Sequence, residues 1–118
     1  MSGYAVGAAG EGVAEIYLTE RGAKIVARNF RAAGGEVDLI AEMDEAIVFV
    51  EVKRRTTGRY GTGAEAVDAQ KQRRISQAAL AYLKRHKLME RKVRFDVVEI
   101  MDMDIRHIKA AFDYAGPR

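Results

Sequence analysis

The spacing of apolar residues along this chain alternates between the period of a helix and that of a strand. Apolar positions three and four apart predict one helix over residues 8–21, which Gly22 should end, and a second helix that Asp68 should cap. The helix side chains that we expect in the core are Val13, Ile16, Tyr17, Leu18, Ile75, Ala78, Ala79, Tyr82 and Leu83.

Runs of apolar and β-branched residues predict the strands between and after these helices. The expected strands cover residues 23–31, 35–40, 46–52, 93–101 and 105–112, the last of them short. Gly34-Gly35 should form the turn between the first two. No internal repeat or linker interrupts this order, so the pattern predicts an α/β fold and a single domain over residues 1–118.

Two of the predicted strands carry charged residues where apolar ones are expected. Asp38 lies in the second strand, and Glu51 and Lys53 lie at the end of the third, on one face of it. A buried charge is costly unless it is paired or bound to a metal. These three residues are therefore the first candidates for a functional site.

A hairpin turn centred on Asp44-Glu45 would bring the acids together. In that register Asp38 stands opposite Glu51, and Glu36 would stand opposite Lys53. Directly opposed side chains have Cβ atoms about 5 Å apart, which is close enough for two carboxylates to share one hard cation.

Two interpretations of this cluster fit the spacing about equally well. In the first, it is a solvated sheet end in which Asp38 pairs with Lys53, and Glu51 pairs with Arg54 or Arg55. In the second, two carboxylates fix a divalent metal for phosphodiester hydrolysis, and Lys53 orients the attacking water or stabilises the charge of the transition state.

The order of the motifs resembles the YraN-like family of small bacterial proteins. The motifs that carry the resemblance are Gly10-Glu11, Gly35-Glu36-Val37-Asp38-Leu39-Ile40-Ala41, Val48-Phe49-Val50-Glu51-Val52-Lys53-Arg54-Arg55, Glu65-Ala66-Val67 and Arg94-Phe95-Asp96-Val97-Val98. Members of this family are largely uncharacterised, and they resemble archaeal Holliday-junction resolvases within the PD-(D/E)xK nuclease superfamily. The resemblance implies a restriction-endonuclease-like α/β core of order αβββαβ, with a mixed sheet flanked by helices.

The resemblance also implies roles for individual residues. Asp38 matches the aspartate of the "PD" element, and Glu51 and Lys53 match the acid and lysine of "ExK". Glu11 matches a glutamate of the first helix that would join Asp38 and Glu51 around Mg²⁺ or Mn²⁺. Val37 departs from the pattern, since the superfamily has proline there.

The charge of the chain adds a candidate surface for nucleic acid. The net charge is only +3, so the distribution of basic residues matters more than their total. Basic residues follow the candidate site directly, through a glycine-rich loop and into the second helix. Those that we expect to contact DNA are Arg54, Arg55, Arg59 and Lys71, with Tyr60 available to stack on a base. The basic run over residues 84–92 is interpreted as a solvated surface.

Composition excludes several other classes. The chain has no cysteine, no signal-peptide pattern at its start and no run of about 20 apolar residues, which together favour a cytoplasmic protein. His86 and His107 lack the pattern of a zinc site. Asp96, within an apolar strand, is expected to pair with an arginine in preference to joining the metal site.

The sequence therefore predicts a Mg²⁺- or Mn²⁺-dependent DNA endonuclease, with branched DNA among the candidate substrates. An alternative is a non-catalytic nucleic-acid-binding accessory protein that keeps the acids as a structural pair. A third is a structural interaction domain in which salt bridges tie up the cluster. A homodimer would suit a two-fold symmetric junction, but no residue establishes it.

Overall fold

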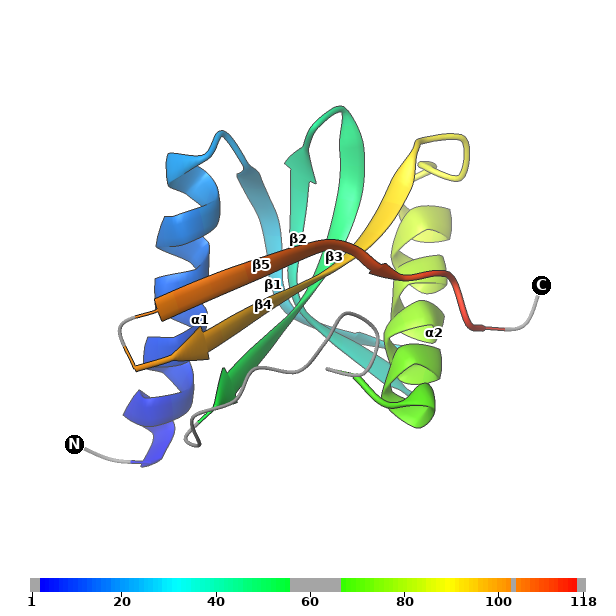
Figure 1. The fold of residues 1–118 in the computed structure, drawn as a ribbon. Coiled ribbons are helices and arrows are strands. Elements are labelled where there is room, and N and C mark those ends of the chain that lie inside the picture. The colour runs from blue at the N-terminus through cyan, green and yellow to red at the C-terminus, as the bar shows by residue number, and fades with distance from the viewer. Residues whose placement is uncertain (1–2, 56–66, 103, 117–118) are drawn as a thin grey trace.

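The computed structural model describes residues 3–55, 67–102 and 104–116. Its elements are α1 (Gly3–Glu20), β1 (Lys24–Ala32), β2 (Gly35–Met43), β3 (Ala46–Arg55), α2 (Ala69–Arg85), β4 (Val93–Met101) and β5 (Asp104–Phe112) (Figure 1). This order confirms the predicted α/β class. The last strand is longer than expected and pairs along most of β4.

One mixed sheet of order β1-β2-β3-β4-β5 forms the middle of the molecule. Neighbouring strands are antiparallel except β3 and β4, which are parallel. Parallel neighbours need a crossover connection, and α2 lies in that connection. The two helices cover opposite faces of the sheet (Figure 1), which is an architecture compatible with the restriction-endonuclease-like core.

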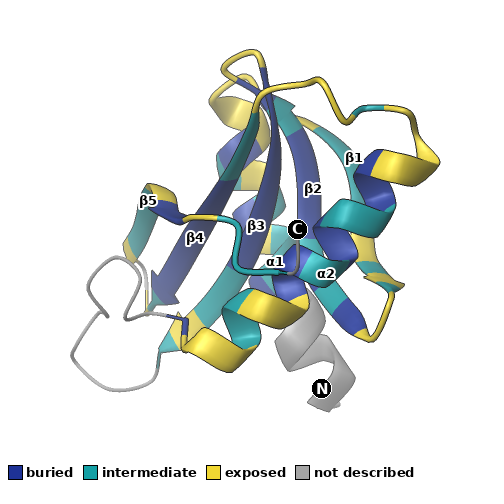
Figure 2. Ribbon diagram, turned by 90° about the vertical axis from the view of Figure 1, so that its right-hand side faces the viewer, coloured by how far each residue is buried: buried dark blue, intermediate teal, exposed yellow. Residues whose placement is uncertain are grey.

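The sheet has a separate core on each face. The core under α2 includes Phe49, Phe95 and Tyr82, and the core under α1 includes Leu18 and Val48. Strands β2, β3 and β4 are buried along most of their length, whereas the edge strands β1 and β5 are largely half-buried or exposed (Figure 2).

The face of α1 that packs on the sheet differs from the expected one. Ala14 and Leu18 are fully buried, but Val13 is 41% exposed and Ile16 is 59% exposed, so the prediction was wrong for these two side chains. The contact stripe consists of positions four apart that include the small residues Gly10 and Ala14, which allow the helix to approach the sheet closely. The predicted stop is confirmed, since Gly22 has a φ of +92°.

Helix α2 follows its sequence pattern closely. Asp68 is the N-cap, and its side chain accepts a hydrogen bond from the backbone N–H of Lys71 at 2.8 Å. The five expected core residues of this helix are all buried. Among the described residues, no helix is long and apolar enough to cross a membrane.

Gly35 is required where α2 crosses the start of β2. A Cβ atom added at Gly35 would lie 1.8 Å from the carbonyl oxygen of Arg74, which is part of the helix backbone and cannot move independently. The glycine therefore sets how closely α2 and the strand of Asp38 approach each other. The turn expected here is made by Ala33 and Gly34, both with positive φ, and Gly35 opens the strand.

Gly35→Ala should accordingly destabilise the fold by about 3 kcal/mol, because the added methyl group forces α2 away from the sheet. Thermal unfolding followed by circular dichroism would measure the effect. Gly12→Ala is the matched control, since Gly12 lies in α1 with open space around its Cα and should gain up to about 1 kcal/mol from helix propensity. Equal melting temperatures for the two variants would contradict the close approach.

Candidate active site

Strands β2 and β3 pair in the predicted register but separate at Asp38. Asp44 and Glu45 form the turn with φ of 53° and 63°, and the pairs Ile40–Phe49 and Leu39–Val50 follow from it. The ladder ends there. The backbone N–H of Val52 donates instead to Asp38 Oδ2 at 2.8 Å. The carboxylate thus takes the place of a strand carbonyl, which fixes its position beside β3.

Glu51 lies on the face of β3 that packs against α2, two residues beyond Phe49. It is only 4% exposed. Its Oε2 lies 3.9 Å from Lys53 Nζ and 3.7 Å from Lys71 Nζ. Its Oε1 is buried and has no hydrogen-bond partner among the described residues. The carboxyl group is therefore incompletely satisfied in its charged form.

Burial and Asp38 together change the acidity of Glu51. Burial is the largest cause, followed by a hydrogen bond shared with Asp38 and by the negative charge of Asp38, and these raise the pKa of Glu51 to about 8. Lys71 and Lys53 act in the opposite direction but do not cancel the effect. The pKa of Glu51 thus lies above neutral pH, far from the ordinary range of a carboxyl group.

Lys71 lies at the start of α2, as expected, and it contacts two acids there. Its Nζ lies 3.7 Å from Glu51 and 3.6 Å from Glu36, so it covers the two acids from the first turn of α2. Glu36 also lies 3.3 Å from Arg31 and 3.8 Å from Arg74. The expected pairing of Glu36 with Lys53 was wrong, because the β2–β3 ladder does not continue past Leu39.

Helix α1 brings Glu11 toward the same acids from the other face of the sheet. Partial burial is the largest cause that raises the pKa of Glu11, and the negative charge of Asp38 is the next. A hydrogen bond with Asn29 lowers it in part. In the part of the chain that the structure describes, no three acidic, histidine or cysteine side chains are close enough to form a metal site together. Asp38 and Glu51 are thus the centre of the site, with Glu11 farther out.

The donor set of this centre fits a hard divalent cation. Asp38 and Glu51 supply carboxylate oxygens, the ligands that Mg²⁺ and Mn²⁺ prefer. The buried, unpartnered Oε1 of Glu51 is the kind of atom that a cation would satisfy. The alternative pairings of Asp38 with Lys53, and of Glu51 with Arg54 or Arg55, are not found among the described ion pairs.

The arginines after the site divide between the two faces of β3. Arg55 lies on the face of Glu51, and its Nε donates to Glu99 at 3.2 Å. Arg54 lies against α1, where its guanidinium is 3.8 Å from the position of a Cβ at Gly10. It is therefore turned away from the acid pair. Arg59 and Tyr60 lie outside the described residues.

The model of a family described as "Uncharacterised protein family UPF0102" matches residues 10–100. The chain belongs to the UPF0102 family. This membership confirms the resemblance to the YraN-like proteins.

Relatives within UPF0102 cover nearly the whole chain. A UPF0102 protein of Geobacter metallireducens is 45% identical over 114 residues, which are 93% of each chain. One of Rhodococcus opacus is 49% identical over 113 residues, 92% of this chain and 96% of its own. One of Symbiobacterium thermophilum is 52% identical over 95 residues, 80% of each. These names state no activity, so function has to be argued from the site.

Another buried acid of this UPF0102 chain has a structural role. Asp96 accepts two hydrogen bonds of 2.8 Å from Arg94, lies 2.7 Å from His107 Nε2 and accepts a third bond from the N–H of Ala110 at 3.0 Å. The expected pairing with an arginine is thereby confirmed. Burial raises the pKa of Asp96, but the bonds from His107 and Arg94 outweigh it, and the pKa falls below its usual value.

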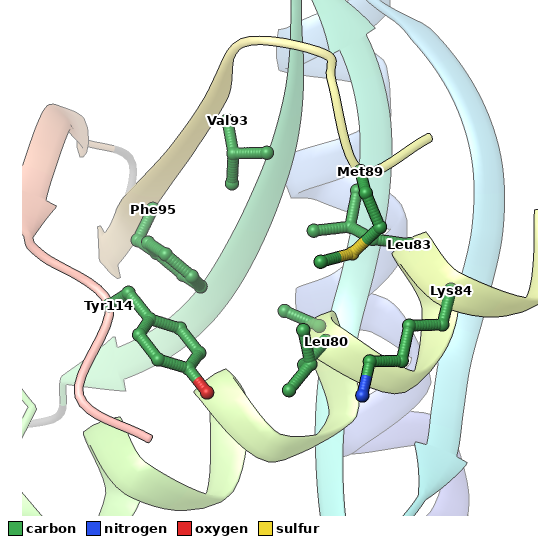
Figure 3. A pocket seen from close by; sticks show the side chains of 8 residues that line it. Leu80, Leu83, Lys84, Met89, Val93, Phe95 and Tyr114 are labelled. Atoms are coloured by element: carbon green, nitrogen blue, oxygen red, sulfur yellow. The ribbon is translucent and has the colours of Figure 1, made fainter. Parts of the chain in front are cut away.

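An apolar pocket of about 470 Å³ lies between α2, the start of β4 and Tyr114 (Figure 3). Its walls include Leu80, Leu83, Met89 and Phe95, and Lys84 is the one charged side chain among the described residues that line it. None of the described residues that line it is a carboxylate, a histidine or a cysteine. It is separate from the acid pair and takes no part in the candidate site.

Two charged residues near the UPF0102 site, Glu99 and Arg106, were missed from the sequence. Glu99 is an acid within an otherwise apolar strand segment, which is the same signal that identified Asp38 and Glu51. Arg106 lies in an edge strand of mixed polarity and carried no such signal. The family match spans Glu11, Asp38, Glu51, Lys53 and Glu99, but ends before Arg106.

Proposed function

We propose that this UPF0102 protein is a Mg²⁺- or Mn²⁺-dependent DNA endonuclease that hydrolyses phosphodiester bonds. One observation carries the proposal: the buried carboxyl of Glu51, with an unpartnered oxygen, stands beside Asp38 and within 3.9 Å of Lys53 Nζ. A strongly perturbed acid next to a second acid and a lysine is typical of a catalytic site.

Each side chain has a role that its position supports. Asp38 and Glu51 would hold the cation, with Glu11 assisting from α1. The bound cation would polarise the phosphate and lower the pKa of an attacking water. Lys53 orients that water and stabilises the negative charge that develops on the phosphate. The N–H of Val52 holds Asp38 in place throughout.

The surroundings of the acids support a nucleic-acid substrate. Beside Glu36 lies a hollow of about 580 Å³ that Arg31 and Arg74 help to line. Their guanidinium groups are partly exposed, with side chains 79% and 46% accessible. These cations lie beside Glu36, which Lys71 links to Glu51, and they suit a phosphate backbone that approaches the site from this side. Branched DNA is one candidate substrate, and a homodimer would suit its symmetry.

The accessory-protein alternative is also favoured by a specific contact. Lys71 and Lys53 both approach Glu51 Oε2, so the acid has two cationic neighbours in the absence of a metal. A protein that binds DNA without cleaving it could keep the acids in this form. The two candidates differ in a single observable, which is strand cleavage.

A cleavage panel tests the proposal directly. Linear, single-stranded, flapped and four-way DNA would each be incubated with Mg²⁺ or Mn²⁺ and either wild-type protein or Glu51→Ala. We expect the wild type to cut at least one substrate and Glu51→Ala to be slower by at least about 10³-fold, since the metal site is lost. Binding by the wild type without cleavage under any condition would support the accessory protein, and equal cleavage by both proteins would place the active site elsewhere.

A further inference from the structure

Glu99 is a fully buried acid held between two arginines on the side of the acid pair. Its side chain is 0% exposed. Glu99 Oε2 lies 3.2 Å from Arg55 Nε, and Glu99 Oε1 lies 3.2 Å from Arg106 Nη2. The three residues come from three adjacent strands, β3, β4 and β5. A carboxylate placed in this way cannot reach solvent, but it can fix the positions of the two guanidinium groups that contact it.

The register of the sheet sets this group directly beside Lys53. Glu99 pairs with Lys53 on one side and with Arg106 on the other. Paired residues of neighbouring strands share a face and lie about 5 Å apart. Lys53, Glu99 and Arg106 therefore form a row across the sheet that begins at the candidate catalytic lysine.

Exposure distinguishes the two arginines from the acid that holds them. The side chain of Arg55 is 31% exposed and that of Arg106 is 38% exposed, against 0% for Glu99. Arg55 contacts Glu99 through Nε, and no partner of its two terminal amino groups is found among the described residues. Among the described residues, the buried carboxylate of Glu99 is thus flanked by two guanidinium groups that are partly exposed at the surface.

We propose that Glu99 is a positioning residue that holds Arg55 and Arg106 as a clamp for one backbone phosphate of DNA. The phosphate lies next to the one that is cleaved at Lys53. Arginine suits this task because its planar guanidinium can donate two parallel hydrogen bonds to phosphate while a second edge is held from below. The inference rests on the proposed function for the identity of the substrate.

The Glu99→Gln variant distinguishes a positioning role from a purely electrostatic one, because the two roles predict opposite changes in DNA affinity. The substitution raises the net charge from +3 to +4, so an acid without a positioning role would, when removed, give tighter DNA binding. Loss of positioning gives weaker binding in spite of the added positive charge. We expect about tenfold weaker affinity, with the melting temperature measured alongside.

Arg106 variants test the same clamp without removing the buried acid. Affinity for a short duplex would be measured by fluorescence anisotropy in EDTA over a range of salt concentrations. Arg106→Gln and Arg55→Gln should each weaken binding about tenfold and reduce the slope of log Kd against log salt by about 0.9, the value for one lost phosphate contact. Arg106→Lys keeps the charge but cannot donate two parallel hydrogen bonds to a phosphate, so it should also bind DNA more weakly than wild type.

Arg91→Gln is the matched control for these variants. Its side chain is 40% exposed and also pairs with a glutamate, Glu42, at 3.6 Å, but it lies at the opposite end of the sheet. It removes the same charge and should change the affinity by less than about twofold. An equal loss for Arg91→Gln and Arg106→Gln would overturn the clamp.

The remaining outcomes separate the clamp from the endonuclease. Tighter binding by folded Glu99→Gln, or full affinity of Arg106→Lys, would overturn the positioning role. If Glu99→Gln does not fold, Arg106→Lys and Arg55→Gln decide. Wild-type binding without cleavage would overturn the proposed activity while the affinities still decide on the clamp. No binding by the wild type would overturn the clamp itself.

Discussion

Lys53→Met is expected to lower the rate of DNA cleavage by at least about 10³-fold, because the negative charge that develops on the phosphate would lose the ammonium group that stabilises it. The position of the lysine suits this role. Its Nζ lies 3.9 Å from Glu51, and the side chain is 34% exposed, so the ammonium group can reach a bound phosphate. Asp38 is held by the N–H of Val52 and not by Lys53.

The same variant should retain its ligands. Mn²⁺ affinity, read from the shift in melting temperature, and DNA affinity, read from anisotropy, should stay within about threefold of wild type, since one phosphate contact at most is lost. Single-turnover kinetics would supply the rate. Lys84→Met, at the exposed end of α2, is the control and should cleave normally. A wild-type rate for Lys53→Met would reduce the lysine to an ion-pair partner of Glu51.

Glu51→Gln should raise the melting temperature of the metal-free protein at pH 8 and abolish the stabilisation by Mn²⁺. The amide keeps the shape of the side chain but cannot ionise in its buried position. Relief of about 1 kcal/mol corresponds to about 4 °C in a chain of this length. Saturating Mn²⁺ should stabilise the wild type by about 2.7 kcal/mol at a hundredfold excess over Kd, or about 10 °C, and Glu51→Gln hardly at all.

The pH dependence of this effect follows from the raised pKa. Glu51 has a pKa of about 8 in the folded protein, above the ordinary value of 4.5, so the folded state binds the proton more tightly than the unfolded state does. Its contribution to stability is therefore full below pH 4.5 and is lost as the pH rises toward 8. Mn²⁺ binds the ionised form and should stabilise the wild type more as the pH rises.

Thermal melts between pH 5 and 8.5, with EDTA or Mn²⁺, would measure both effects. Glu90→Gln removes an exposed carboxylate and serves as the control. The melting temperature of the wild type should fall relative to that of Glu51→Gln as the pH rises in EDTA. Parallel curves for the two proteins would mean that Glu51 is ionised at all these pH values, and Mn²⁺ stabilisation of Glu51→Gln would place the metal elsewhere.

The hairpin that carries the acids could be predicted from the sequence because local rules determine it. Alternating apolar residues and a two-residue turn set the pairs from Met43–Ala46 to Leu39–Val50, and the structure confirms them. The separation of the strands at Asp38 could not be predicted in the same way. It depends on the Asp38 carboxylate, which accepts the hydrogen bond from the N–H of Val52 in place of a backbone carbonyl. The pattern of apolar residues does not show such a contact.

Contacts between segments that are distant in the sequence could not be predicted either. The sequence placed Lys71 at the start of the second helix, but it did not show that Lys71 contacts Glu51 and Glu36. The packing face of α1 was misjudged because its closest residues, Gly10 and Ala14, are small, while the larger Val13 and Ile16 remain exposed. In both cases the tertiary approach of two elements decided the outcome.

The parallel pairing of β3 with β4 also bears on how the molecule folds. Asp38 and Glu51 lie on a hairpin that closes through a turn of two residues, whereas the pair Ile47–Val93 joins positions 46 residues apart (93 − 47). Hairpins form in about 1–10 μs, and pairings between distant positions come later because more chain entropy is lost. We therefore expect the strands of the two acids to pair early, whereas Lys71 can reach Glu51 only when α2 has crossed the sheet, and Glu99 can lie beside Lys53 only when β4 has docked.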